Sequence, residues 1–205
     1  MLSIAVQHHP SRLLPEALRR YEVVTDPDPD GQPSAIRCYL ECLRRTPPEA
    51  THRLVLQDDV ELARDFDARA AAAVAELPGD VIAFFVPKFA LHGKWMREAH
   101  EVGKRWCALP SSANWAPAVA TCWPVELVGD FLDYATAHVA RRRARGLHTT
   151  GDDPVIGAWK RARSRTIWAT VPSLVQHPDV GYSLVKLRDY NGQNLARRAA
   201  VFADD

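Results

Sequence analysis

The chain has 205 residues, 47% of them hydrophobic and 25% charged, and 26 basic against 25 acidic side chains leave a net charge of +1. This size and composition fit one soluble globular domain that needs no disulfide framework. The near-neutral charge gives no global electrostatic case for nucleic acid or an anionic membrane as the main partner. No apolar run approaches the ~20 residues that span a bilayer, and the first residues lack a signal-peptide pattern, so we expect a cytoplasmic protein without a membrane span.

Strands and helices alternate through the first half of the chain. Apolar runs and helical spacing predict strands at 2–6, 22–25, 53–57 and 81–86 and helices at 13–21, 34–45 and 65–77. The Asp- and Pro-rich stretch at 26–33 predicts a rigid acidic loop. The alternation predicts an α/β fold with a mostly parallel central sheet flanked by helices, and the wholly apolar strand at 81–86 should be central in it.

The second half is less regular in its pattern. Residues 87–125 are rich in aromatic and turn residues, and we expect irregular structure there with strands near 105–109 and 119–123. The remaining predicted elements are a helix at 126–145, a helix from about 154 to 163, a strand at 166–171 and a polar tail from 181. The four cysteines lack a zinc-ligand spacing, which favours buried free thiols over a metal site.

Polar side chains follow three of the predicted strands. His8 and His9 end the first, Asp26 follows the second, and Asp58 and Asp59 follow the third. Ligands of parallel sheets bind beyond the carboxyl ends of the strands. Adjacent carboxylates at a buried strand end repel each other and lose hydration, and a bound Mg²⁺ or Mn²⁺ resolves this conflict. The alternative is a pair of solvated loop acids.

Residues 54–62, Leu-Val-Leu-Gln-Asp-Asp-Val-Glu-Leu, resemble the DXD region of GT-A glycosyltransferases, in particular the LEDDVEL form of the lipooligosaccharide galactosyltransferase-like families. The resemblance rests on short motifs and extends over about residues 1–185. It implies a single Rossmann-like GT-A domain over 1–205 with a small antiparallel extension. Within that domain, 1–86 would be the nucleotide-binding half, 87–185 the acceptor and catalytic half, and 186–205 a C-terminal tail.

The resemblance also implies roles for the acidic pair. Asp59 would bind Mn²⁺ or Mg²⁺ directly, and Asp58 would contact the ribose or a metal-bound water. Gln57 stands where the LEDDVEL form has an acid. Many GT-A enzymes supply a late histidine as a further metal ligand, and His177 fits that position; a loop histidine without a role is the alternative.

The nucleotide-sugar, with a UDP-sugar favoured, would lie against the strand ends. Residues 8–12, His-His-Pro-Ser-Arg, resemble the first turn of phage-type glycosyltransferase-like proteins, and Arg12 can pair with a phosphate through two nitrogens. Asp26 would contact the base, and Ser183 would turn toward the diphosphate. The implied binding set is His8, His9, Arg12, Asp26, Gln57, Asp58 and Ser183.

Two further groups point to the acceptor side. Asp152 and Asp153 precede Pro154 at a helix start, where one acid is expected to cap the helix and the other to act as general base. We assign Asp152 as the base and Asp153 as the cap, although the sequence leaves the two roles interchangeable. Lys88, His92 and Trp115 are candidates for an acceptor or sugar pocket, because aromatic faces bind sugar rings well; buried core packing is the alternative.

These features predict a metal-dependent glycosyltransferase that acts on an unidentified acceptor hydroxyl with inversion. The acceptor stays open among protein, glycan, lipid head group and modified DNA. The basic stretches 141–145 and 160–165 would suit a phosphate backbone, yet solvated helix faces explain them more simply. The alternatives are a sugar nucleotidyltransferase, for which residues 8–12 lack a glycine-rich phosphate loop, and a non-catalytic nucleotide-sugar-binding module.

Overall fold

A seven-stranded sheet forms the centre of the protein in a computed structural model that describes residues 1–32, 34–88, 90–113, 115–147, 151–177 and 198–204. Its strands, in spatial order, are β2 (Glu22–Thr25), β1 (Leu2–His8), β3 (His52–Gln57), β7 (Ala120–Pro124), β5 (Ile82–Ala83), β8 (Ile167–Thr170) and β6 (Trp106–Leu109). β1 pairs in parallel with β2 and β3, and β5 with β8, whereas β7 and β6 run against their neighbours. The predicted α/β fold with a mostly parallel sheet is therefore confirmed.

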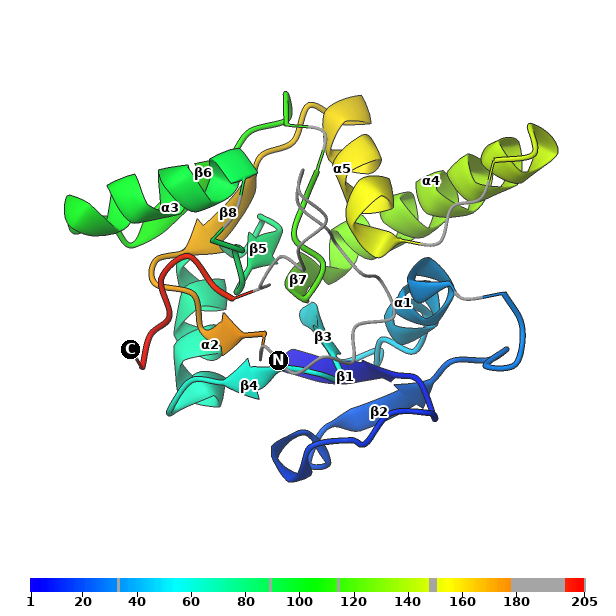
Figure 1. Ribbon diagram of the computed structural model, residues 1–205, viewed down its shortest axis with the longest axis horizontal. Coiled ribbons are helices and arrows are strands. Elements are labelled where there is room, and N and C mark those ends of the chain that lie inside the picture. Colours follow the sequence, from blue (N-terminus) through cyan, green and yellow to red (C-terminus); the bar gives the residue numbers. More distant parts are fainter. Residues whose placement is uncertain (33, 89, 114, 148–150, 178–197, 205) are drawn as a thin grey trace, which may run out of the picture.

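Helices cover both faces of this sheet (Figure 1). They are α1 (Ala35–Arg44), α2 (Phe66–Glu76), α3 (Ala90–Glu101), α4 (Val125–Ala144) and α5 (Asp152–Ala162). Strand side chains alternate between the faces, so Ala5 and Val55 join the core beneath α1, α4 and α5, while Val6 and Leu56 join the core beneath α2. Both faces of the sheet are thus buried.

A second, smaller sheet pairs β4 (Glu61–Leu62) with β9 (Val175–Gln176) in antiparallel fashion. It confirms the predicted small antiparallel extension. Near the C-terminus, Ala199 and Phe202 form bridges with Pro87 and Ser173, so the described part of the tail packs against the strand ends. The boundary expected at residue 86, between a nucleotide-binding half and an acceptor half, does not separate two parts of the sheet, because β7 from the second half lies between β3 and β5 from the first.

The helix expected at 13–21 is wrong. The structure has a single 3₁₀ turn there, Glu16–Leu18, and Leu18 is its buried residue. Leu13 is 88% exposed, so the apolar stripe of the predicted helix has no surface to pack against. Short helices are only marginally stable without such packing. The next element of the chain, β2, begins at Glu22.

The expected irregular structure at 87–125 is also corrected. β6 and β7 confirm the two predicted strands, but α3 occupies Ala90–Glu101. Its sequence contains Gly93 and aromatic residues, which are weak helix formers. Met96 and Ala99 are buried against the sheet, so tertiary packing stabilises a helix that local propensity does not predict.

The strand predicted at 81–86 is central but short, since β5 covers Ile82–Ala83 alone. All six residues of the run are buried, and the backbone of Phe84 bonds instead to Ala120, Leu174 and Val175. The four cysteines are free and buried, as expected. Among the described helices, none has the length and apolar character needed to cross a membrane.

Candidate functional site

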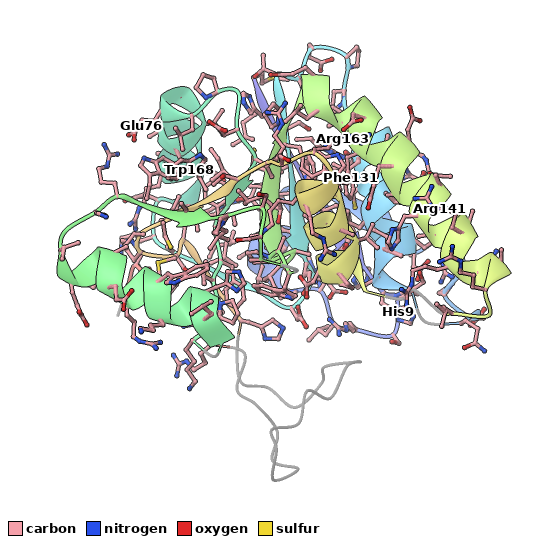
Figure 2. All side chains as sticks on the ribbon, turned by 90° about the horizontal axis from the view of Figure 1, so that it is seen from above. His9, Glu76, Phe131, Arg141, Arg163 and Trp168 are labelled. Atoms are coloured by element: carbon pink, nitrogen blue, oxygen red, sulfur yellow. The ribbon has the colours of Figure 1, made fainter. Side chains whose placement is uncertain are left out.

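The chain reverses its direction of travel across the sheet between β1 and β3. From β1 it moves to β2 on one side and then returns to β3 on the other, which gives the local order β2-β1-β3. In open α/β sheets, ligands bind in the crevice that such a switch creates at the carboxyl ends of the strands. In Figure 2, His9 marks this edge, on the side of the molecule opposite Glu76 and Arg163 at the far ends of α2 and α5.

Asp58 organises the turn that follows β1. It is 4% exposed. Its Oδ2 accepts a hydrogen bond from the backbone N–H of His9 at 2.9 Å and lies 2.9 Å from Nδ1 of His8. Its Oδ1 accepts a hydrogen bond from Arg12 Nη1 at 2.8 Å. Both carboxylate oxygens are therefore engaged by the β1 turn, which makes Asp58 unsuited to bind a metal directly.

Arg12 lies between the two carboxylates of the acidic pair. The same Nη1 donates to Asp59 Oδ2 at 2.6 Å. Burial lowers the pKa of Arg12, but the charges of Asp59 and Asp58 more than compensate and leave the pKa above its ordinary value. From the sequence, a bound cation is expected to offset the repulsion between Asp58 and Asp59. In this structure the positive charge between them is the guanidinium of Arg12.

Asp59 also approaches His177, which follows β9. Its Oδ2 lies 3.3 Å from His177 Nε2. Its Oδ1 is buried and has no hydrogen-bond partner within the described part of the chain. Burial alone would raise the pKa of Asp59, but His177 and Arg12 hold it below its ordinary value. Asp59 thus has one oxygen that lacks a hydrogen-bond partner among the residues that the structure describes.

Asp59 and His177 fit two neighbouring ligands of a divalent cation. Adjacent ligands of an octahedral ion with bonds of ~2.1 Å lie roughly 3 Å apart, close to the 3.3 Å between Asp59 Oδ2 and His177 Nε2. Oxygen and imidazole ligands suit Mn²⁺. The described residues contain no group of three or more side chains ready to hold a metal, so water and phosphate would have to complete the shell.

Asp26 lies beside the same edge but is tied to α1. Its backbone N–H donates to His8 O at 2.9 Å. Its two carboxylate oxygens accept hydrogen bonds from Arg37 at 2.7 and 2.9 Å. Burial would raise the pKa of Asp26, but Arg37 outweighs it and lowers the pKa. A base contact from Asp26 would have to share its oxygens with Arg37.

Asp152 and Asp153 form a second cluster on the opposite face of the same strand ends. Asp152 is 3% exposed, and its Oδ2 accepts hydrogen bonds from Gln7 at 3.2 Å and from Gln57 at 3.4 Å. Its Oδ1 accepts from the backbone N–H of Asp153 at 2.9 Å. Burial raises the pKa of Asp152.

The expectation that Asp153 caps α5 is wrong. The helix begins two residues earlier than predicted, with Gly151 at the N-cap, so both acids lie in its first turn. Asp153 Oδ1 instead accepts a hydrogen bond from the backbone N–H of Ala118 at 2.7 Å. That bond fastens the start of α5 to the segment that leads into β7.

A third cluster surrounds His92. This side chain is 6% exposed, and its ring centroid lies 5.3 Å from that of Trp95 and 5.2 Å from that of Trp115. Burial, with a smaller contribution from Lys160, lowers the pKa of His92 to about 4, so the ring is neutral at physiological pH. Neither ring nitrogen has a hydrogen-bond partner among the described residues.

Sequence reasoning missed Lys160, which was assigned to an exposed basic helix face. It is fully buried and donates to the carbonyls of Trp115 at 3.1 Å and Leu109 at 3.4 Å. Burial lowers the pKa of Lys160 to about 8. Its helical spacing from the apolar residue Ile156 was the available signal. Arg163 of the same stretch is paired with Asp130 at 2.7 Å, so this stretch is not a free basic face.

The predicted residues therefore fall into separate groups. One joins His8, His9, Arg12, Asp58, Asp59 and His177, and another joins Gln57 and Asp152. Lys88 is exposed, and none of the described contacts joins it to His92 or Trp115. Ser183 lies outside the described residues.

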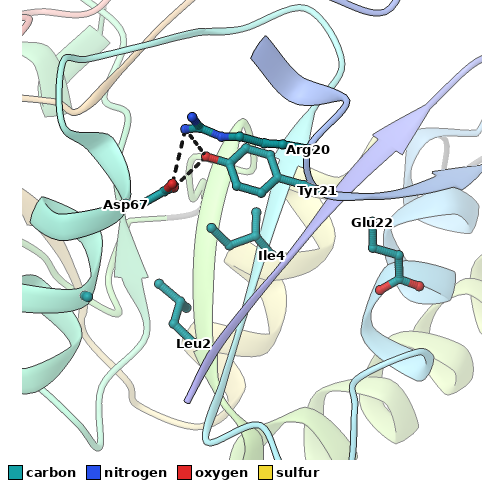
Figure 3. A pocket seen from close by; sticks show the side chains of 7 residues that line it. Leu2, Ile4, Arg20, Tyr21, Glu22 and Asp67 are labelled. Carbon is teal, nitrogen blue, oxygen red and sulfur yellow. Dashed lines mark hydrogen bonds and ion pairs between the residues drawn. The ribbon is translucent and has the colours of Figure 1, made fainter. Parts of the chain in front are cut away.

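A pocket of about 510 Å³ lies at the opposite, amino edge of the sheet (Figure 3). Leu2 and Ile4 contribute apolar surface to it. Three of its polar side chains pair with one another, since Tyr21 donates to Asp67 at 2.6 Å and Arg20 lies 3.3 Å from Asp67, and the fourth, Glu22, pairs with Arg53. It therefore offers few unpaired polar groups to a ligand.

Comparison with known proteins adds no identification. No protein-family model matches the chain, and no curated protein matches it either.

Proposed function

We propose that this protein is a metal-dependent glycosyltransferase of the GT-A type, which moves a sugar from a nucleoside-diphosphate sugar to an acceptor hydroxyl. The observation that carries the proposal is the pairing of Asp59 with His177, at 3.3 Å, on the β1/β3 switch of a mostly parallel sheet. The buried Asp59 Oδ1, which has no partner among the described residues, supports it further.

Asp59 and His177 would hold Mn²⁺ or Mg²⁺ in this proposal. The ion would neutralise the charge that develops on the departing diphosphate, for which a UDP-sugar is the favoured donor. Asp58 would fix the turn after β1 through His8 and His9. Arg12 lies close enough to the acidic pair to contact the same diphosphate.

For the general base we now favour Asp153 over Asp152. Asp152 is 3% exposed, and both of its oxygens already accept hydrogen bonds. Asp153 is half-buried and lies in the first turn of α5, beside Asp152. A carboxylate there would take the proton of the acceptor hydroxyl as that hydroxyl displaces the diphosphate with inversion.

We propose only that the acceptor carries a hydroxyl group. A protein and modified DNA are both among the candidate acceptors. His92 and Trp115 support a sugar pocket, because a neutral imidazole beside an indole face offers both hydrogen bonding and stacking.

A nucleotide-sugar-binding module without catalysis is the second candidate. The position of Arg12 favours it, because a protein cation already neutralises Asp58 and Asp59. Such a module would bind the nucleotide without a metal.

Thermal-shift screening of UDP, GDP, TDP and CMP sugars, with and without Mn²⁺, tests the proposal. A ligand at about 100 times its Kd adds about 2.7 kcal/mol to the free energy of unfolding, which corresponds to roughly 5–10 °C in Tm for a chain of this size. We expect such a rise for one nucleotide class with Mn²⁺ present. Release of nucleoside diphosphate in a turnover assay would then separate the enzyme from the binding module.

Asp59→Ala should abolish the Mn²⁺-dependent part of the rise. Asp133→Ala, which changes an exposed acid on α4, should leave it unchanged. The proposal fails if no nucleotide stabilises the protein, or if Asp59→Ala retains the full Mn²⁺-dependent stabilisation.

A further inference from the structure

The acidic pair contains its own cation. A single nitrogen, Arg12 Nη1, donates to Asp58 Oδ1 at 2.8 Å and to Asp59 Oδ2 at 2.6 Å. The side chains of Arg12 and Asp59 are each 18% exposed, and that of Asp58 is 4% exposed. Arg12 therefore occupies the space between the carboxylates, where a shared cation would bind.

One oxygen, Asp59 Oδ2, contacts both Arg12 and the second proposed metal ligand, His177. Asp59 Oδ2, which accepts the short hydrogen bond from Arg12, is also the oxygen 3.3 Å from His177 Nε2. A divalent ion held by Asp59 and His177 would lie beside the guanidinium, and two cations at that separation repel each other strongly in a partly buried site.

We propose that Arg12 is the resident cation of the Asp58–Asp59 pair, and that a divalent ion binds at Asp59 only when Arg12 leaves Asp59 Oδ2. This inference rests on the proposed function, since it takes Asp59 and His177 as the metal ligands. It makes Arg12 the residue that limits metal affinity in the nucleotide-free protein.

The surroundings of Arg12 allow the side chain to leave while the turn stays in place. The backbone N–H of Arg12 bonds to His9 O at 2.9 Å, independently of its guanidinium. Asp58 keeps its contacts with His8 and His9 when Arg12 departs. Asp59 keeps His177 and would gain the metal in exchange.

A diphosphate would supply the new partner for Arg12. Guanidinium and phosphate form strong paired hydrogen bonds. Nucleotide binding would draw Arg12 from Asp59 and so raise the affinity for the metal, and linkage requires the metal to raise the nucleotide affinity by the same factor. Metal and nucleotide would then bind together rather than separately.

The test is the affinity for Mn²⁺, followed by the electron paramagnetic resonance signal of the free ion, without nucleotide. Arg12→Gln and Arg12→Ala should bind Mn²⁺ more tightly than the unchanged protein, by a factor within the roughly 5- to 150-fold range of typical coupling. Arg20→Gln is the matched control, since Arg20 pairs with Asp67 at the opposite edge of the sheet and should leave the affinity unchanged. UDP should raise Mn²⁺ affinity by a larger factor in the unchanged protein than in the Arg12 variants.

The outcomes separate this inference from the proposed function. If Asp59→Ala abolishes Mn²⁺ binding but the Arg12 variants bind no more tightly, the role given to Arg12 is wrong and the glycosyltransferase proposal stands. If neither the unchanged protein nor any variant binds Mn²⁺ or nucleotide, both fall. Should the variants fail to fold, the side-chain NMR signal of Arg12 in the unchanged protein decides: it should shift on saturation with Mg²⁺, and a constant signal would overturn the inference.

Discussion

Gln57 is a side chain at a strand end that contacts the buried carboxylate of Asp152. Its amide donates to Asp152 Oδ2 at 3.4 Å, and Gln7, its register partner in β1, donates to the same oxygen at 3.2 Å. The form that residues 54–62 resemble has an acid in place of Gln57. Because Asp152 is a buried carboxylate, an amide donor suits this position, and the substitution is no sign of a degenerate site.

Gln57→Glu should therefore destabilise the fold. It replaces a donor with a second carboxylate beside Asp152, and we expect a loss of about 1–3 kcal/mol at neutral pH. Repulsion raises the pKa of a carboxyl in the folded state, so the loss of stability relative to the unchanged protein is smallest at low pH and grows as pH rises to that raised pKa. Urea unfolding at several pH values measures this.

Gln32→Glu makes the same chemical change at an exposed position in the acidic loop and should alter stability little at any pH. A Gln57→Glu variant as stable as the unchanged protein at pH 8 would show that Gln57 and Asp152 do not interact as described.

The candidate site was predictable at the residue scale only in part. Asp58 and Asp59 stand out because two acids directly follow an apolar strand. The pairing of Arg12 with Asp58 could not be predicted, because the two residues are 46 apart in the chain and a sequence pattern does not show which charged side chains pair. The burial of Lys160 was hidden in the same way, because the buried carbonyls that it binds leave no sequence pattern.

At the scale of elements, prediction worked where burial imposes a pattern. β1 and β3 were predicted because strands buried on both faces give short apolar runs. The turn at Glu16–Leu18 was mistaken for a helix, and α3 was missed, because each depends on which apolar face finds a partner. Local propensity holds no such information.

Substitutions at two helical glycines, Gly93 and Gly129, distinguish the effect of helix propensity from that of packing. A Cβ added at Gly93 in α3 would lie 2.5 Å from the carbonyl oxygens of Pro87 and Lys88, whereas one added at Gly129 in α4 would meet nothing within 4 Å. We expect Gly129→Ala to stabilise by about 0.8–1 kcal/mol and Gly93→Ala to destabilise by about 1–3 kcal/mol. Thermal unfolding of both variants measures the difference in sign. Equal stabilisation by both would contradict the close approach of α3 to residues 87–88.

At the scale of the whole molecule, the parallel strands bring distant polar residues to one edge. β1, β3 and the segment after β9 deliver His8, Asp58, Asp59 and His177 to it, and α5 begins beside them. The opposite edge holds the pocket of Figure 3, whose charged side chains all have ion-pair partners: Arg20 pairs with Asp67, and Glu22 with Arg53. Function is therefore proposed at the carboxyl edge.

We propose that a divalent ion and a nucleoside diphosphate bind together at Asp59 and His177. The most direct measurement is the anomalous scattering of Mn²⁺ in crystals grown with UDP and MnCl₂. We expect an anomalous peak between Asp59 and His177, with diphosphate density on its outer side and Arg12 turned toward the phosphates. A peak elsewhere, or UDP bound at the amino-edge pocket with Arg12 still between Asp58 and Asp59, would contradict it.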